Sequence, residues 1–116
     1  MSDAREFLPL KPLVFEILLA LGEGERHGWS LVREVQARGS DERLLPANFY
    51  RTLRAMLADG LIAESDRRPP ADTDERRRYF RLTPLGRDAA RLEARRLQEI
   101  VADARLRRLL KAKAGQ

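Results

Sequence analysis

Four side chains suited to nucleic-acid recognition occur within one short stretch of the chain. They are an asparagine, a tyrosine and two arginines, namely Asn48, Tyr50, Arg51 and Arg54. A guanidinium group pairs with phosphate or guanine, a carboxamide pairs with adenine, and a phenolic hydroxyl binds phosphate. These residues fall away from an apolar stripe with helical spacing, formed by Phe49, Leu53, Met56 and Leu57. We therefore expect one face of a helix to pack and the other to reach toward DNA; the alternative is a solvated polar face.

The helix that carries these residues has a stop signal at each end. Pro46 suits the first turn, because its missing N–H is one that a helix leaves unpaired anyway. Gly60 suits the position just past the end. The sequence predicts a helix over residues 46–59.

A second basic cluster lies on a segment with β periodicity. It consists of three consecutive arginines, Arg76, Arg77 and Arg78. Apolar and polar side chains alternate over residues 77–82, with Phe80 and Leu82 on one face. Together with the β-like residues 61–65, this segment predicts a two-stranded wing. A Pro-Pro pair in the intervening residues 67–75 prevents regular pairing and indicates a solvated tip.

Residues 10–21 and 29–38 have the periodicity of two earlier helices. Residues 22–28 between them predict a turn, and its glycines do not form a phosphate-binding loop, because a helix rather than a strand precedes them. We expect His27 to cap or pack at the start of the second helix rather than to catalyse. We expect Trp29 to pack in the core rather than to line a ligand pocket.

Residues 84–114 predict a last helix that is long for this chain, with Thr83 as its N-cap and Pro84 as its first residue. About thirty residues would span roughly 45 Å. Small and apolar residues repeat at spacings of four and three along one seam, which consists of Ala90, Ala94, Leu97, Val101 and Ala104. Because no further helix is left to cover the distal part, we expect the seam to form a homodimer. The alternative is a lone amphipathic helix that frays in solution.

Length and composition favour one domain with an anionic partner. The chain has 116 residues, of which 43% are hydrophobic, and a formal net charge of +5. This suffices for one core, so we expect a winged helix-turn-helix domain over 1–83 and a dimerisation helix over 84–116, joined as one structural unit. The expected fold class is mainly α with a small β-hairpin.

Several function classes are disfavoured by what the sequence lacks. Without cysteine, the chain forms neither disulfides nor thiolate metal sites, which agrees with a cytoplasmic location. The apolar run over residues 13–21 is much shorter than the roughly 20 residues needed to cross a bilayer, so we expect no membrane partner. No nucleophile-base pair or metal-ligand cluster is recognisable. We therefore expect no enzyme activity, no metal and no cofactor.

These segments together resemble the PadR family of winged-helix transcriptional regulators, in its short form with a single C-terminal dimerisation helix. The resemblance covers about residues 10–97 and depends on segments in a fixed order: Ile17-Leu-Leu-Ala-Leu-Gly-Glu-Gly24, His27-Gly-Trp-Ser-Leu-Val32, Leu45-Pro-Ala-Asn-Phe-Tyr-Arg-Thr-Leu-Arg54 with Asp59-Gly-Leu-Ile62, and Arg77-Arg-Tyr-Phe-Arg-Leu-Thr-Pro-Leu-Gly86. It implies a dimeric repressor whose recognition helices enter successive major grooves of a near-palindromic operator.

The resemblance also implies roles for individual residues. Four residues would face DNA, namely Asn48, Tyr50, Arg51 and Arg54. Three residues of the wing would contact phosphate, namely Arg76, Arg77 and Arg78. Two departures from the family pattern are visible. Trp29 stands where the family usually has tyrosine, and three acidic residues near the wing tip argue against the tip itself as a DNA contact: Asp72, Asp74 and Glu75.

The sequence thus predicts a sequence-specific regulator whose partner is double-stranded DNA, in the cytoplasm and on the nucleoid when bound. A small-molecule effector that releases the regulator is left open. The alternative is a non-enzymatic protein-interaction module that uses the winged-helix scaffold and the amphipathic C-terminal helix. Salt separates the two, because phosphate binding falls steeply with salt whereas an apolar helix interface hardly responds.

Overall fold

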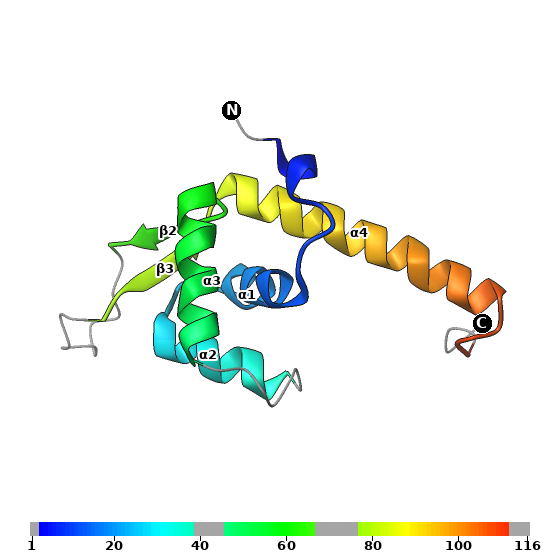
Figure 1. The fold of residues 1–116 in the computed structure, drawn as a ribbon, viewed down its shortest axis with the longest axis horizontal. Coiled ribbons are helices and arrows are strands. Elements are labelled where there is room, and N and C mark those ends of the chain that lie inside the picture. Colours follow the sequence, from blue (N-terminus) through cyan, green and yellow to red (C-terminus); the bar gives the residue numbers. More distant parts are fainter. Residues whose placement is uncertain (1–2, 39–45, 67–76, 112–116) are drawn as a thin grey trace.

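Helices make up most of the residues that the computed structural model describes, which are 3–38, 46–66 and 77–111. In chain order the elements are the short 3-10 helix η1 (Ala4–Phe7), α1 (Pro12–Gly22), β1 (Arg26–His27), α2 (Gly28–Ala37), α3 (Pro46–Asp59), β2 (Ile62–Ser65), β3 (Tyr79–Leu82) and α4 (Pro84–Leu106). Figure 1 shows α1, α2 and α3 gathered beside the small sheet, with α4 extending away from them. The expected fold class, mainly α with a small β element, is confirmed.

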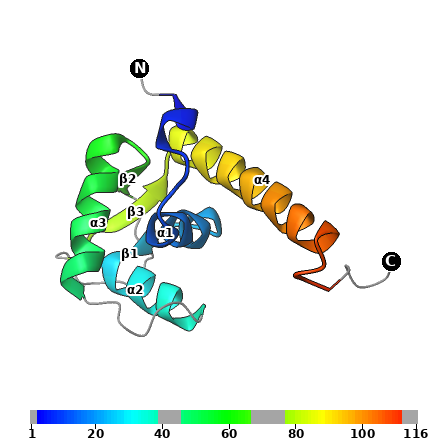
Figure 2. The same ribbon diagram turned by 45° about the vertical axis from the view of Figure 1, so that its right-hand side comes forward.

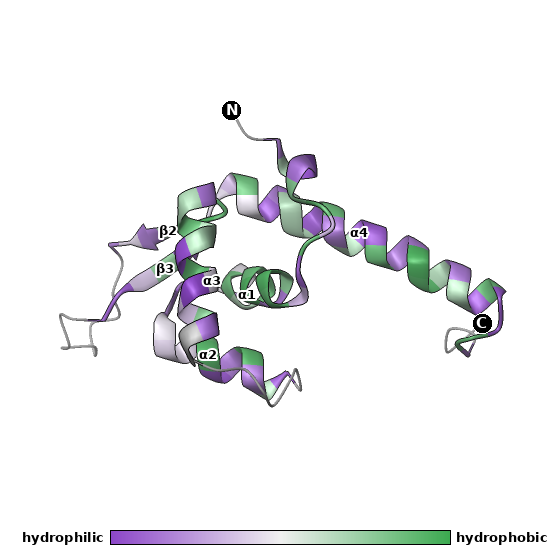
Figure 3. Ribbon diagram, in the orientation of Figure 1, coloured by the Kyte–Doolittle hydropathy of each residue, from purple (hydrophilic) through white to green (hydrophobic). Residues whose placement is uncertain are grey.

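Helix α1 lies at the centre of the domain. It contacts α2, α3, α4 and β3, and Figure 2 shows it between α4 and the other two helices. Its sequence is almost entirely apolar, as Figure 3 shows. The side chains that are almost fully buried around it come from every helix of the core and from β2, among them Ile17, Leu18, Leu31, Val35, Phe49, Leu53, Met56 and Ile62. Burying each such side chain contributes about 1.5 to 3 kcal/mol, so this cluster holds the three helices together.

The sheet has three strands, one more than the sequence predicted. Strand β3 is central, and both β1 and β2 pair with it in antiparallel register. The segment over residues 22–28 was expected to be a turn only, because two paired residues are too few to show alternation. Strand β1 exists because β3 supplies its hydrogen-bonding partner. It also brings the His27 ring edge-to-face against Tyr79, with ring centroids 5.4 Å apart, so Tyr79 is buried as well as Phe80.

Thr83 and Gly86 join the start of α4 to the start of the wing. The Thr83 side chain caps α4 by accepting a hydrogen bond from the Gly86 amide at 3.0 Å. Its hydroxyl group donates to two carbonyl oxygens, that of Gly60 at 2.6 Å and that of Leu61 at 2.9 Å. The expected N-cap is confirmed. Gly86 is required beside it, because a Cβ at this position would collide with the Leu61 carbonyl group.

The last helix is shorter than expected, because it ends at Leu106 rather than near residue 114. The Leu109 amide donates to the Ala104 carbonyl at 2.9 Å and the Arg108 amide donates to that of Arg105 at 3.0 Å. These bonds form a Schellman motif, in which Arg108 adopts a positive φ of 62°. Glycine usually occupies that position, so an arginine there gave no stop signal in the sequence. The observed 23 residues span about 35 Å.

Glu93 ties α4 to the start of the chain. It is the buried charged residue of the described core, 2% exposed, and its carboxylate accepts two hydrogen bonds from Arg96, at 2.6 Å and 3.0 Å. It also accepts from the backbone amide of Leu10. The bonds from Arg96 lower the pKa of Glu93, although burial acts in the opposite direction.

Among the described residues, no helix has the length and apolar character that a membrane span requires.

Gly86→Ala is expected to destabilise the fold by at least about 3 kcal/mol, because the collision is with backbone that cannot move without opening the junction. The measurement is the free energy of unfolding by urea titration. The control is Gly22→Ala, whose Cβ would meet no atom within 4 Å and which should be neutral or stabilising by up to about 1 kcal/mol. Equal stability of the two variants would show that the Leu61 contact does not constrain the fold.

Glu93→Gln is expected to lower the free energy of unfolding at pH 7 by about 1 to 2 kcal/mol, a modest figure because Arg96 is partly exposed. A carboxyl whose folded-state pKa is lowered stabilises the fold above its ordinary pKa of about 4.3, and this stabilisation is lost as the pH falls through the folded-state value. The difference from the parent protein should therefore shrink in acid. Glu99→Gln, at an exposed position of the same helix, serves as the control. A difference that stays constant with pH would contradict the role of the charge.

Candidate nucleic-acid interface

Helix α3 presents one packed face and one polar face, as its periodicity predicts. Phe49, Leu53 and Met56 are buried, whereas the four polar candidates Asn48, Tyr50, Arg51 and Arg54 are all exposed. Within the described parts of the chain, the side chains of Arg51 and Arg54 form no ion pair and no hydrogen bond. Among the described residues, none therefore occupies the donors of these two guanidinium groups.

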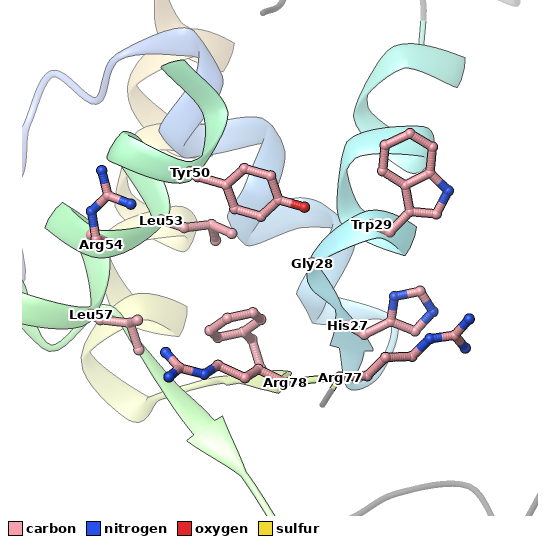
Figure 4. A pocket seen from close by; sticks show the side chains of 10 residues that line it. His27, Gly28, Trp29, Tyr50, Leu53, Arg54, Leu57, Arg77 and Arg78 are labelled. Carbon is pink, nitrogen blue, oxygen red and sulfur yellow. The ribbon is translucent and has the colours of Figure 1, made fainter. Parts of the chain in front are cut away.

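The structure brings some of these candidates together and separates others. Tyr50 and Arg54 line one cavity with Arg77 and Arg78 of the wing, and Figure 4 shows the tyrosine ring directed across this cavity toward α2. Arg51 lines a different groove, between α3 and the segment that precedes α1. Asn48 belongs to the exposed face but lines neither the cavity nor the groove.

The wing carries its basic residues just before β3. Arg77 and Arg78 are exposed, while Arg76 and the acidic wing tip lie outside the described residues. One guanidinium nitrogen of Arg78 is 3.4 Å from a carboxylate oxygen of Glu64 on β2. A surface ion pair of this kind contributes at most about 1 kcal/mol, so it holds Arg78 only weakly against a competing phosphate.

The start of α2 forms the far wall of the cavity. His27 is its N-cap, and the imidazole Nδ1 accepts a hydrogen bond from the Ser30 amide at 3.2 Å. The expected capping role of His27 is confirmed. Gly28 follows, and a Cβ placed on it would lie 3.2 Å from a ring carbon of Tyr50. The absent side chain of Gly28 therefore lets the Tyr50 ring lie against the positive end of α2.

The expectation that Trp29 packs in the core is wrong, since its side chain is 57% exposed. The buried face of α2 is formed by Leu31, Val32 and Val35. At 100° per residue, position 29 lies more than a quarter turn away from the centre of that face. The helical wheel therefore places Trp29 outside the buried face, although its place early in the helix had favoured core packing. Trp29 instead lines the cavity together with Tyr50.

A third helix that packs on two others with its polar face outward, followed by a wing, defines the winged helix-turn-helix class of DNA-binding proteins. Residues 17–92 match the transcriptional regulator PadR-like family, and the chain belongs to this family. It is therefore a transcriptional regulator rather than an enzyme. The resemblance noted in the sequence is confirmed.

Known proteins agree with this assignment. Transcriptional regulator Rv3488 of Mycobacterium tuberculosis is 33% identical to this chain over 87 residues, which are 75% of this chain and 77% of that protein. Two solved structures share the fold. A PadR family regulator from Clostridium difficile has a TM-score of 0.69 at 21% identity, covering 83% of this chain and 97% of its own. A PadR-like regulator from Bacillus cereus has a TM-score of 0.72 at 18% identity, covering 87% and 93%.

Proposed function

We propose that the protein is a homodimeric repressor that binds a near-palindromic operator through α3 and the wing. The observation that carries this proposal is the exposed face of α3, on which two arginines without partners in the described chain stand beside a wing that bears further arginines. The proposed DNA contacts are Asn48, Tyr50, Arg51 and Arg54 from α3, with Arg76, Arg77 and Arg78 from the wing.

The two kinds of contact have different consequences. Arginine contacts to phosphate release counterions, so they supply most of the affinity and make it steeply dependent on salt. Base contacts from α3 in the major groove supply discrimination, about 1 to 3 kcal/mol for each good bidentate pair. Asn48 and Arg54 have the side chains that form such pairs, and the Tyr50 hydroxyl suits phosphate.

The distal part of α4 supports the proposed dimer. Beyond the domain the helix exposes large apolar side chains, including Ile100 at 52% and Leu106 at 83%. Figure 3 shows hydrophobic segments recurring along this part of α4. A second copy that packs along the seam of Ala90, Ala94, Leu97, Val101 and Ala104 would cover Ile100, which flanks the seam, whereas Leu106 lies on the opposite side of the helix. A two-fold axis between the helices would also place two copies of α3 on successive turns of DNA.

The proposal allows release by a small-molecule effector, and thermodynamics places one requirement on such a ligand. An effector must bind the DNA-competent and DNA-incompetent dimers with different affinity. The angle between the two α4 helices would be the element that changes between these states. The proposed location is the cytoplasm, with the protein on the nucleoid when it is bound to DNA.

Arg51→Ala is expected to weaken operator binding by about 1 to 3 kcal/mol and to reduce the salt slope by about one unit, because one phosphate or base contact is lost. The operator is first selected from a pool of genomic fragments by the purified protein, and affinity is then measured by fluorescence anisotropy at several salt concentrations. Arg87→Ala removes the same charge from an exposed position on α4 and should bind like the parent. Uniform weak binding of all fragments would favour the protein-interaction module.

Val101→Glu is expected to convert the dimer to a monomer and to weaken operator binding, because it places a charge in the apolar seam. The measurement is sedimentation velocity on the free protein. Ala102→Glu adds the same charge at an exposed position outside the seam and should remain dimeric. If both variants sediment like the parent, α4 is not the dimer interface.

A further inference from the structure

Trp29 is the most exposed aromatic residue of the described chain. It is 57% exposed, whereas the next aromatic residue, Tyr50, is 38% exposed. The indole N–H donates to no acceptor among the described residues. Tryptophan is typical of interfaces, because it offers a large apolar ring together with one polar donor. A partner that covers the ring and accepts from the N–H would satisfy both parts of this side chain.

Trp29 lies between two hollows of the surface. On one side it lines the cavity between α2, α3 and the wing, together with four proposed DNA contacts, namely Tyr50, Arg54, Arg77 and Arg78. Figure 4 shows Trp29 projecting from α2 across from Arg54 of α3. On the other side Trp29 lines a groove of about 380 Å³ along α2, which we call the α2 groove. Trp29 therefore joins the surface that is proposed to face DNA to the exposed side of α2.

The α2 groove carries a further arginine without a partner in the described chain. Arg33 lies one turn after Trp29, is exposed, and forms neither an ion pair nor a hydrogen bond with a described residue. The acidic residue that lines this groove, Glu34, lies within ion-pair distance of Arg26 and Arg38, at 3.9 Å and 3.4 Å. Because these two arginines neutralise Glu34, the groove offers the charge of Arg33 to solvent.

We propose that the DNA contact surface continues from α3 across the start of α2, with Trp29 and Arg33 as two further contacts to the DNA backbone. The indole N–H of Trp29 would donate to a phosphate oxygen, and the ring would lie against the adjoining deoxyribose. Arg33 would neutralise a second phosphate, since four helical residues separate the two side chains by about 6 Å along the axis. This inference rests on the proposed function and adds two residues to its DNA contacts.

The charges around Trp29 favour DNA over a protein partner. The charged residues that line the cavity are all arginines, and no aspartate or glutamate occurs among its described lining residues. Arg33 continues this basic surface on the other side of the indole. A surface of one sign attracts a polyanion and gains affinity from the release of counterions. Contacts of this kind fix the position of the protein on the duplex but do not read its sequence.

The fluorescence of Trp29 tests its position directly, because the chain contains a single tryptophan. The selected operator is titrated into the full chain, and the anisotropy of labelled operator is measured in parallel. The emission of Trp29 should change along the same binding curve as the anisotropy, and it should return to its starting value when salt releases the DNA. Constant emission during binding that the anisotropy reports would overturn the contact of Trp29.

Trp29→Phe should weaken operator binding about three- to tenfold, because the aromatic ring remains but the N–H donor is lost. The dependence of affinity on salt should match that of the parent, because a neutral side chain releases no counterion. The urea midpoint should also match, since Trp29 is exposed. Unchanged affinity in a folded variant would refute the hydrogen bond to phosphate.

Arg33→Gln should have the complementary effect, because it removes a charge. It should reduce the salt slope by about one unit and weaken binding to all DNA sequences alike. The control is Arg87→Gln, which removes the same charge from an exposed position on α4 and should keep the slope of the parent. Equal slopes in the two variants would show that Arg33 contributes only net charge and would overturn its contact with phosphate.

The outcomes separate this inference from the proposed function. Tight binding of a selected operator with constant Trp29 emission would leave the repressor intact and refute the extension onto α2. Failure to select any operator would refute the proposed function itself. Emission that changes when the protein is diluted, but not when operator is added, would place Trp29 between two copies of the chain and would refute its contact with DNA.

Discussion

The contact between Thr83, Gly86 and the backbone at Gly60 and Leu61 sets the geometry of the whole molecule. Helix α3 ends at this point, β2 begins here, and β3 passes directly into α4. Because the Thr83 hydroxyl and the Gly86 backbone both lie against the same peptide units, the three directions of α3, the wing and α4 are fixed relative to one another. The relative placement of α3 and α4 therefore depends on a few backbone contacts.

Much of the fold could be predicted from the sequence, because its helices combine clear periodicity with clear stop signals. Helix α3 begins at Pro46 and ends before Gly60 as expected, and Thr83 caps α4. Two misses share a physical cause, which is that tertiary contacts determined the local structure: strand β1 forms only against β3, and η1 contacts α4. The end of α4 has a local cause instead, because its last turn closes on a left-handed arginine rather than a glycine.

The candidate site was predictable in its residue types but not in its grouping. Periodicity indicated that Tyr50, Arg51 and Arg54 point outward from α3, and they are exposed. It could not show that Tyr50 and Arg54 share a cavity with Trp29 while Arg51 lies in another groove. That division depends on how α2 and the wing pack around α3, which the sequence of α3 does not encode.

The distribution of acidic residues distinguishes α3 from the other helices of a chain that is rich in arginine. Helix α4 mixes acidic and basic residues, and several pair within a turn, as Arg96 does with Glu93 and Arg107 with Asp103. On α2, Glu34 lies near both Arg26 and Arg38. Helix α3 has a single acidic residue, Asp59, at its far end. Arg33 on α2 and Arg87 on α4 also have no ion pair within the described chain, but among the described helices α3 is the one whose arginines have no acidic residue within four positions, which favours an anion at its exposed face.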